Sequence, residues 1–170
     1  MNHIVIIGFM GSGKTRVGKR IAKDLQHEFV DLDKIVTAKM KMPVSEIFQR
    51  FGEPFYRAME TYTVKSLLEA PEQMVISLGA AFPCQEQNEE YIRKLGTVVY
   101  LKGSPEVILG RLREIPGSPL ETAGEDKIIR MLHARDPIYK KFADITVETG
   151  VVSFDELVKK IEAELKKQLK

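Results

Sequence analysis

Residues 4–15 read Ile-Val-Ile-Ile-Gly-Phe-Met-Gly-Ser-Gly-Lys-Thr, an apolar run that leads into the pattern G-x-x-x-x-G-K-[ST]. Apolar residues recur at helical spacing after Thr15 and predict a helix over 14–25. A strand, a glycine-rich turn and a helix are the context in which this pattern binds nucleotide phosphates. The glycines let backbone N–H groups point inward, and the helix N-terminus adds partial positive charge. The chain is therefore predicted to bind a nucleoside triphosphate.

The same motif predicts a role for each of its polar groups. The backbone of Gly11, Ser12 and Gly13 would bind phosphate oxygens, and Lys14 would reach the β- and γ-phosphates. The Thr15 hydroxyl would hold Mg²⁺. An ordinary glycine-rich turn is the alternative, and the flanking strand and helix patterns disfavour it.

Composition sets limits on the kind of protein. The 170 residues are 44% hydrophobic and 29% charged, as in an ordinary globular domain, and the net charge of +2 gives no argument for nucleic acid. Cys84 is the only cysteine, so no intrachain disulfide can form, which suits a reducing compartment. No apolar run approaches the ~20 residues that span a bilayer. We expect a cytoplasmic monomer, with no nucleic-acid or membrane partner.

Strand and helix patterns alternate along the chain. Apolar runs predict strands at 4–7, 29–30, 74–76, 97–101 and 145–147, and helical periodicity fits 14–25, 34–39, 45–51, 54–68, 85–94, 105–112, 126–134 and 154–169. This alternation predicts an α/β fold with a doubly wound, parallel, five-stranded sheet flanked by helices, in a single domain over 1–170. The irregular stretch 114–125 is interpreted as a lid loop, with a plain connection as the alternative.

Two aspartates follow the second predicted strand. Asp31 ends it, facing the phosphate loop, and is a candidate ligand for Mg²⁺, directly or through water. Asp33 could orient an acceptor hydroxyl or accept its proton. It could equally be the N-terminal cap of a helix from Lys34.

Three further stretches carry candidate groups. Arg57 and Glu60 share a helix face, either as a surface pair or as a held guanidinium that grips a carboxylate. The small-residue turn at Gly79 could bring backbone N–H groups to a ligand, although a packed strand end is the simpler interpretation. Arg135 ends a predicted helix before Pro137 and could bind an anion or complement the helix dipole.

Taken together, these residues resemble the shikimate kinase family over almost the whole chain. The family pattern combines the phosphate loop, a D-x-D pair, G-E-x-x-F-R-x-x-E, a strand ending S-T-G-G-G, a lid with R-P-L-L, and R-x-P-x-Y. Here they stand at 8–15, 31–33, 52–60, 77–81, 118–121 and 135–139, with Tyr56 in place of the phenylalanine.

The resemblance implies a phosphate-loop kinase that uses ATP and Mg²⁺ to make shikimate 3-phosphate and ADP. Arg57 and Arg135 would bind the shikimate carboxylate, and Glu60 would orient Arg57. Asp33 would lie at the ring hydroxyls and act as a catalytic residue with Lys14, and Gly79 would give a backbone contact to the substrate. Thr15 and Asp31 would serve Mg²⁺, and Arg111 would lie against the adenine.

Two departures fall on the acceptor and lid side. Ala80 and Ala81 replace glycines, which would cost about 1 kcal/mol or more if either position needed a positive φ. Ser118 replaces the lid arginine, and loss of a comparable arginine lowers phosphoryl transfer roughly 10³- to 10⁵-fold elsewhere. Arg113 is a candidate substitute. The alternatives are a kinase for another small hydroxylated carboxylic acid and a non-catalytic nucleotide sensor.

Overall fold

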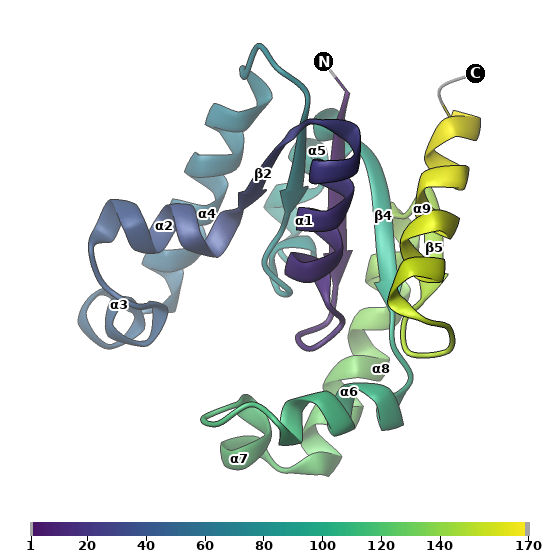
Figure 1. Ribbon diagram of the computed structural model, residues 1–170. Coiled ribbons are helices and arrows are strands. Elements are labelled where there is room, and N and C mark those ends of the chain that lie inside the picture. The colour runs from purple at the N-terminus through teal and green to yellow at the C-terminus, as the bar shows by residue number, and fades with distance from the viewer. Residues whose placement is uncertain (1, 169–170) are drawn as a thin grey trace.

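The computed structural model describes residues 2–168 and contains a sheet flanked by helices (Figure 1). In chain order the elements are β1 His3–Gly8, α1 Lys14–Leu25, β2 Glu28–Asp31, α2 Leu32–Met40, α3 Val44–Phe51, α4 Glu53–Leu68, β3 Met74–Ser77, the 3₁₀ turns η1 Phe82–Cys84 and η2 Glu86–Asn88, α5 Glu89–Leu95, β4 Gly96–Lys102, α6 Pro105–Arg113, α7 Pro119–Ala123, α8 Glu125–Phe142, β5 Ile145–Glu148 and α9 Phe154–Gln168. Within these residues, no helix is long and apolar enough to cross a membrane.

The sheet confirms the predicted fold class. Its five strands are parallel and lie in the order β2-β3-β1-β4-β5. The register pairs Ser77 with both Ile6 and Asp31, so β1, β2 and β3 end at one edge. The turns that follow these strands therefore meet at that edge, as ligand sites in open α/β sheets require.

Alternate residues of β1 pack on opposite faces of the sheet, as its continuous apolar run predicts. Val5 and Ile7 face a core built with α4, α5, α6 and α8. Ile4 and Ile6 face a second core built with α1 and α9. In Figure 1, α2, α3 and α4 lie to one side of the sheet, and α6, α7 and α8 lie beyond the strand ends.

Three predicted helix boundaries are wrong. Helix α8 continues through Pro137 to Phe142, whereas the sequence predicted a helix that ends before this proline. A proline inside a helix costs about 3 kcal/mol, and here Tyr139 and Phe142 are buried beyond it, so packing offsets the loss. Of the predicted helix over 85–94, Gln85 is extended and residues 86–88 form a 3₁₀ turn, with the buried Asn88 side chain donating to the Phe82 carbonyl at 3.1 Å.

The third boundary concerns Asp33. Helix α2 begins at Leu32, and its N-cap is Asp31, whose Oδ1 accepts from the Lys34 N–H at 3.4 Å. Asp33 therefore lies inside the first turn and is not the cap. At the other end of the chain, α9 has the expected capping pair of Ser153 and Glu156, and the predicted final helix residue, Leu169, lies outside the described residues.

Candidate active site

The phosphate loop links β1 to α1. Gly11 and Gly13 have φ values of 79° and 94°, in the left-handed region that favours glycine. The loop is closed by a hydrogen bond from the Ser12 N–H to the Phe9 carbonyl at 3.1 Å. Ser12 Oγ is buried and has no hydrogen-bond partner among residues 2–168. The loop thus has the backbone geometry that the motif predicts.

Lys14 lies at the meeting point of several elements. Its Nζ donates to the carbonyls of Gly8 and Phe9, at 3.0 and 3.1 Å. Burial lowers its pKa to about 8, against the opposing charges of Asp33 and Asp31, and Arg135 lowers it further. Charged side chains from β2, α2 and α8 therefore act on the Lys14 ammonium group, so three predicted site residues, Asp31, Asp33 and Arg135, lie in its electrostatic surroundings.

Thr15 and Asp31 supply two oxygen donors at the same edge. The Thr15 hydroxyl donates to Asp31 Oδ2 at 3.1 Å. Both residues line a cavity of about 380 Å³, which also includes Lys14 and Asp33. Within residues 2–168 no cluster of three or more acidic, His or Cys side chains could hold a metal on its own. A hydroxyl and one carboxylate fit Mg²⁺, which keeps several waters and takes phosphate oxygens.

A second cavity, of about 400 Å³, opens on the other side of the phosphate loop. Arg111 Nη1 donates to the carbonyls of Gly11 and Ser12, both at 3.0 Å, and Nη2 donates to Thr149 Oγ1 at 2.9 Å. Arg111 thus joins α6, the loop and the segment after β5. Thr149 and Gly150, which follow the last strand and line this cavity, were not predicted from the sequence.

Arg57 and Glu60 are not a surface pair. Arg57 Nη1 lies 3.0 Å from Glu60 Oε2, and the Glu60 side chain is completely buried. In the part of the chain that the structure describes, Glu60 Oε1 has no hydrogen-bond partner. Burial raises the pKa of Glu60 to about 7, against the opposing charge of Arg57, and the charge of Asp33 adds to the rise. Glu53 holds the outer side of the guanidinium at 3.0 Å.

The turn after β3 lies against these carboxylates. A Cβ on Gly79 would lie 2.9 Å from Glu60 Oε1 and 3.2 Å from Asp33 Oδ1. Only glycine fits there without displacing a carboxylate. Within the described residues, positive φ at non-glycine positions occurs at Gln26 and Lys41, so neither Ala80 nor Ala81 has the strain that the sequence analysis considered.

Arg135 approaches the same region from α8. Its guanidinium carbon lies 5.6 Å from the centre of the Phe9 ring in the phosphate loop. Burial raises the pKa of Cys84, and the charges of Arg135 and Arg57 both oppose that rise. The charges of both arginines therefore act on one thiol, which follows the Gly79 turn, although α4 and α8 are far apart in sequence.

The lid region contains α7, so it is not wholly irregular. Ser118 is buried, and its hydroxyl donates to the Leu112 carbonyl at 2.8 Å. Arg113 forms an ion pair with Glu125, across the base of the lid. From 114 to 125 the sequence has three glutamates, Glu114, Glu121 and Glu125, and no lysine or arginine. The residue in place of the lid arginine therefore points inward and carries no charge.

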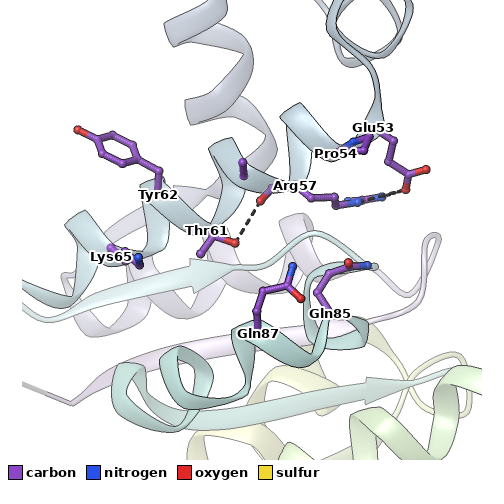
Figure 2. A pocket seen from close by; sticks show the side chains of 9 residues that line it. Glu53, Pro54, Arg57, Thr61, Tyr62, Lys65, Gln85 and Gln87 are labelled. Carbon is purple, nitrogen blue, oxygen red and sulfur yellow. Dashed lines mark hydrogen bonds and ion pairs between the residues drawn. The ribbon is translucent and has the colours of Figure 1, made fainter.

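A larger cavity, of about 620 Å³, is a different feature (Figure 2). It runs along α4 toward Gln85 and Gln87, and Arg57 and Glu53 lie at one end of it. Neither Lys14 nor either aspartate lines it, so the reactive groups do not meet there. The cavity that holds Lys14, Asp31 and Asp33 is the candidate active site.

Comparisons with known proteins identify the family of the chain. A family model described as shikimate kinase matches residues 10–166. The shikimate kinase of Thermodesulfovibrio yellowstonii is 37% identical over 163 residues, covering 95% of this chain and 93% of the relative. That of Neisseria gonorrhoeae is 38% identical over 149 residues, covering 86% and 87%.

Solved structures show the same likeness. Shikimate kinase from Acinetobacter baumannii in complex with shikimate superposes with a TM-score of 0.89 at 32% identity, covering 100% of this chain and 96% of that one. A gluconokinase from Sinorhizobium meliloti, with a TM-score of 0.63 and 19% identity, shares the fold alone.

Proposed function

The chain belongs to the shikimate kinase family, and from that premise we propose how its residues transfer the γ-phosphoryl group of ATP to the 3-hydroxyl of shikimate. One observation carries the proposal. Lys14 and Asp33 line one cavity, and Asp33 meets the buried Arg57–Glu60 pair at Gly79. Asp33 therefore lies between the proposed site for the ATP phosphates and the proposed site for the carboxylate of the acceptor.

On the nucleotide side, the N–H groups of Gly11, Ser12 and Gly13 bind phosphate oxygens. Lys14 exchanges its loop carbonyls for the β- and γ-phosphates and compensates the charge that develops during transfer. The cavity next to Arg111 and Thr149 accepts the adenosine part. Thr15 and Asp31 would hold Mg²⁺, which would neutralise phosphate charge.

On the acceptor side, Arg57 and Arg135 bind the carboxylate of shikimate, and Glu60 fixes the Arg57 guanidinium. The N–H groups after Gly79 add a backbone contact. Asp33 binds the ring hydroxyls and directs the 3-hydroxyl at the γ-phosphate. Positioning and charge neutralisation account for most of what phosphoryl transfer requires of a protein.

The 3-hydroxyl oxygen forms a bond to the γ-phosphorus, and the bond from that phosphorus to the β–γ bridging oxygen breaks, leaving ADP. The hydroxyl proton passes to the Asp33 carboxylate. We assign this activity to one kinase domain over residues 1–170, acting as a cytoplasmic monomer.

The product identifies the reaction. After incubation with Mg·ATP and shikimate, phosphorus–proton NMR is expected to show coupling between the new phosphorus and the proton on C3. Coupling at another ring carbon, or a product formed only from a different hydroxylated acid, would overturn the assignment. A protein that binds ATP and forms no phosphorylated product would instead fit a nucleotide sensor.

A further inference from the structure

Tyr56 departs from the family pattern, which has phenylalanine at this position next to Arg57. Its ring is buried in a cluster with Val36 and Ile47, between α2, α3 and α4. The ring meets Phe48 edge to face, with centroids 5.1 Å apart. These are contacts that a phenylalanine ring could make equally well, so the hydroxyl is the group that this chain adds.

That hydroxyl reaches the active site. It donates to Oδ1 of Asp33, on α2. Burial raises the pKa of Tyr56, and its contact with Asp33 raises it further, so the phenol keeps its proton and acts as a donor. Within residues 2–168 the Asp33 carboxylate makes no other hydrogen bond, so Oδ2 has no partner there, and Asp33 lines the cavity that holds Lys14.

The surroundings make such a donor useful. Oδ1 of Asp33 and Oε1 of Glu60 both approach Gly79, at 3.2 and 2.9 Å from where its Cβ would be. Two carboxylates in one buried region disfavour each other's charge. A hydrogen bond to an ionised carboxylate is among the stronger ones, and it also fixes the direction of the remaining lone pairs.

We propose that Tyr56 is a positioning residue for phosphoryl transfer: it holds Asp33 through Oδ1 so that Oδ2 faces the acceptor hydroxyls. The inference rests on the proposed function and adds to it a residue that the phenylalanine of the family pattern cannot replace chemically. Tyr56 itself is too buried to touch the substrate, so its whole effect passes through Asp33.

The kinetic test is Tyr56→Phe, which removes one oxygen and keeps the ring. We expect kcat/KM for shikimate to fall about tenfold, as for a lost hydrogen bond to a charged group. The KM for ATP should change less than twofold, because the nucleotide contacts are elsewhere. The matched control is Tyr100→Phe, since that buried hydroxyl also donates to a carboxylate, Asp136, at 2.7 Å.

A double-variant cycle separates positioning from general destabilisation. In an Asp33→Asn background, Tyr56→Phe is expected to cause less than a twofold further change, because the partner is already altered. The role of Tyr56 would be overturned if the fold-changes in kcat/KM from Asp33→Asn and Tyr56→Phe multiply in the double variant. It would also be overturned if Tyr56→Phe and Tyr100→Phe had the same shikimate kinetics.

An NMR experiment tests the contact between Tyr56 and Asp33 without measuring turnover. With tyrosines labelled at Cζ, the Tyr56 resonance should move in Asp33→Asn and the Tyr100 resonance should not; a Tyr56 resonance that stays in place would refute the contact. Wild-type protein that does not turn over shikimate would overturn the proposed function and this inference together. Wild-type turnover that Tyr56→Phe leaves intact would overturn this inference alone.

Discussion

Arg57 and Glu60 form an ion pair at 3.0 Å in which the Glu60 side chain is completely buried and keeps one oxygen without a partner among the described residues. A carboxylate so placed is held for a purpose other than stability, because a buried ion pair rarely repays its desolvation. Its neighbours explain the arrangement, since it fixes a guanidinium beside the turn at Gly79.

The buried Glu60 should make stability depend on pH. Its pKa is about 7 in the folded protein and 4.5 in the reference state, so the folded state binds more protons between these values. The free energy of unfolding should therefore fall as pH rises from about 4.5 to 7, by at most about 3 kcal/mol. Denaturant unfolding across this range measures the fall, which Glu60→Gln should abolish. An equal fall in Glu60→Gln would contradict the assignment.

Lys14 should take up a proton when the nucleotide binds. With a pKa of about 8, it is about three-quarters neutral at pH 8.5, and bound phosphates favour its charged form. Calorimetry of ATP binding in buffers of different ionisation enthalpy should then show net uptake of more than half a proton. The control Lys19→Ala, at an exposed position of α1, should keep this uptake. Uptake by Lys14→Ala equal to that of the wild type would assign the proton elsewhere.

Gly79→Ala should damage the acceptor site. The new Cβ would lie 2.9 Å from Glu60 Oε1 and 3.2 Å from Asp33 Oδ1, so a carboxylate must move. We expect a rise of about tenfold or more in the KM for shikimate, corresponding to at least ~1.4 kcal/mol, with little change in the KM for ATP. Gly110→Ala, where nothing lies within 4 Å of the new Cβ, is the control and should leave both constants unchanged. Equal kinetics for the two variants would place the acceptor elsewhere.

Ser118→Arg distinguishes the lid of this chain from that of the family pattern. From the sequence alone, restoring the arginine is expected to raise turnover. Because Ser118 is buried and donates to Leu112, we now expect no rise and a lower melting temperature, from a loss of about 1 kcal/mol or more. Thr122→Arg, at an exposed lid position, should leave the melting temperature unchanged. A gain in turnover by Ser118→Arg would show that this segment can turn outward.

The sequence was sufficient for the sheet because the fold depends on local patterns. Continuous apolar runs predicted all five strands, and the glycine spacing predicted the phosphate loop. The helix end before Pro137 was wrong because the burial of Tyr139 and Phe142 depends on contacts across the molecule. Patterns among neighbouring residues in the sequence do not include the free energy of those contacts.

The site was predictable only in part, for the same reason. The spacing of Arg57 and Glu60 shows that they share a face, and only packing shows that this face is buried. The bond from Tyr56 to Asp33 joins residues on α4 and α2, and its only sign in the sequence is a tyrosine where the pattern has phenylalanine. The inward direction of Ser118 has no sign in the sequence.

The most direct test of the account is the initial rate of ADP release by the purified protein with Mg·ATP, measured with and without shikimate, using Lys14→Ala as the blank. We expect release that depends on shikimate in the wild type and none above background in Lys14→Ala. Confirmed ATP binding with release that does not respond to shikimate would contradict the central claim.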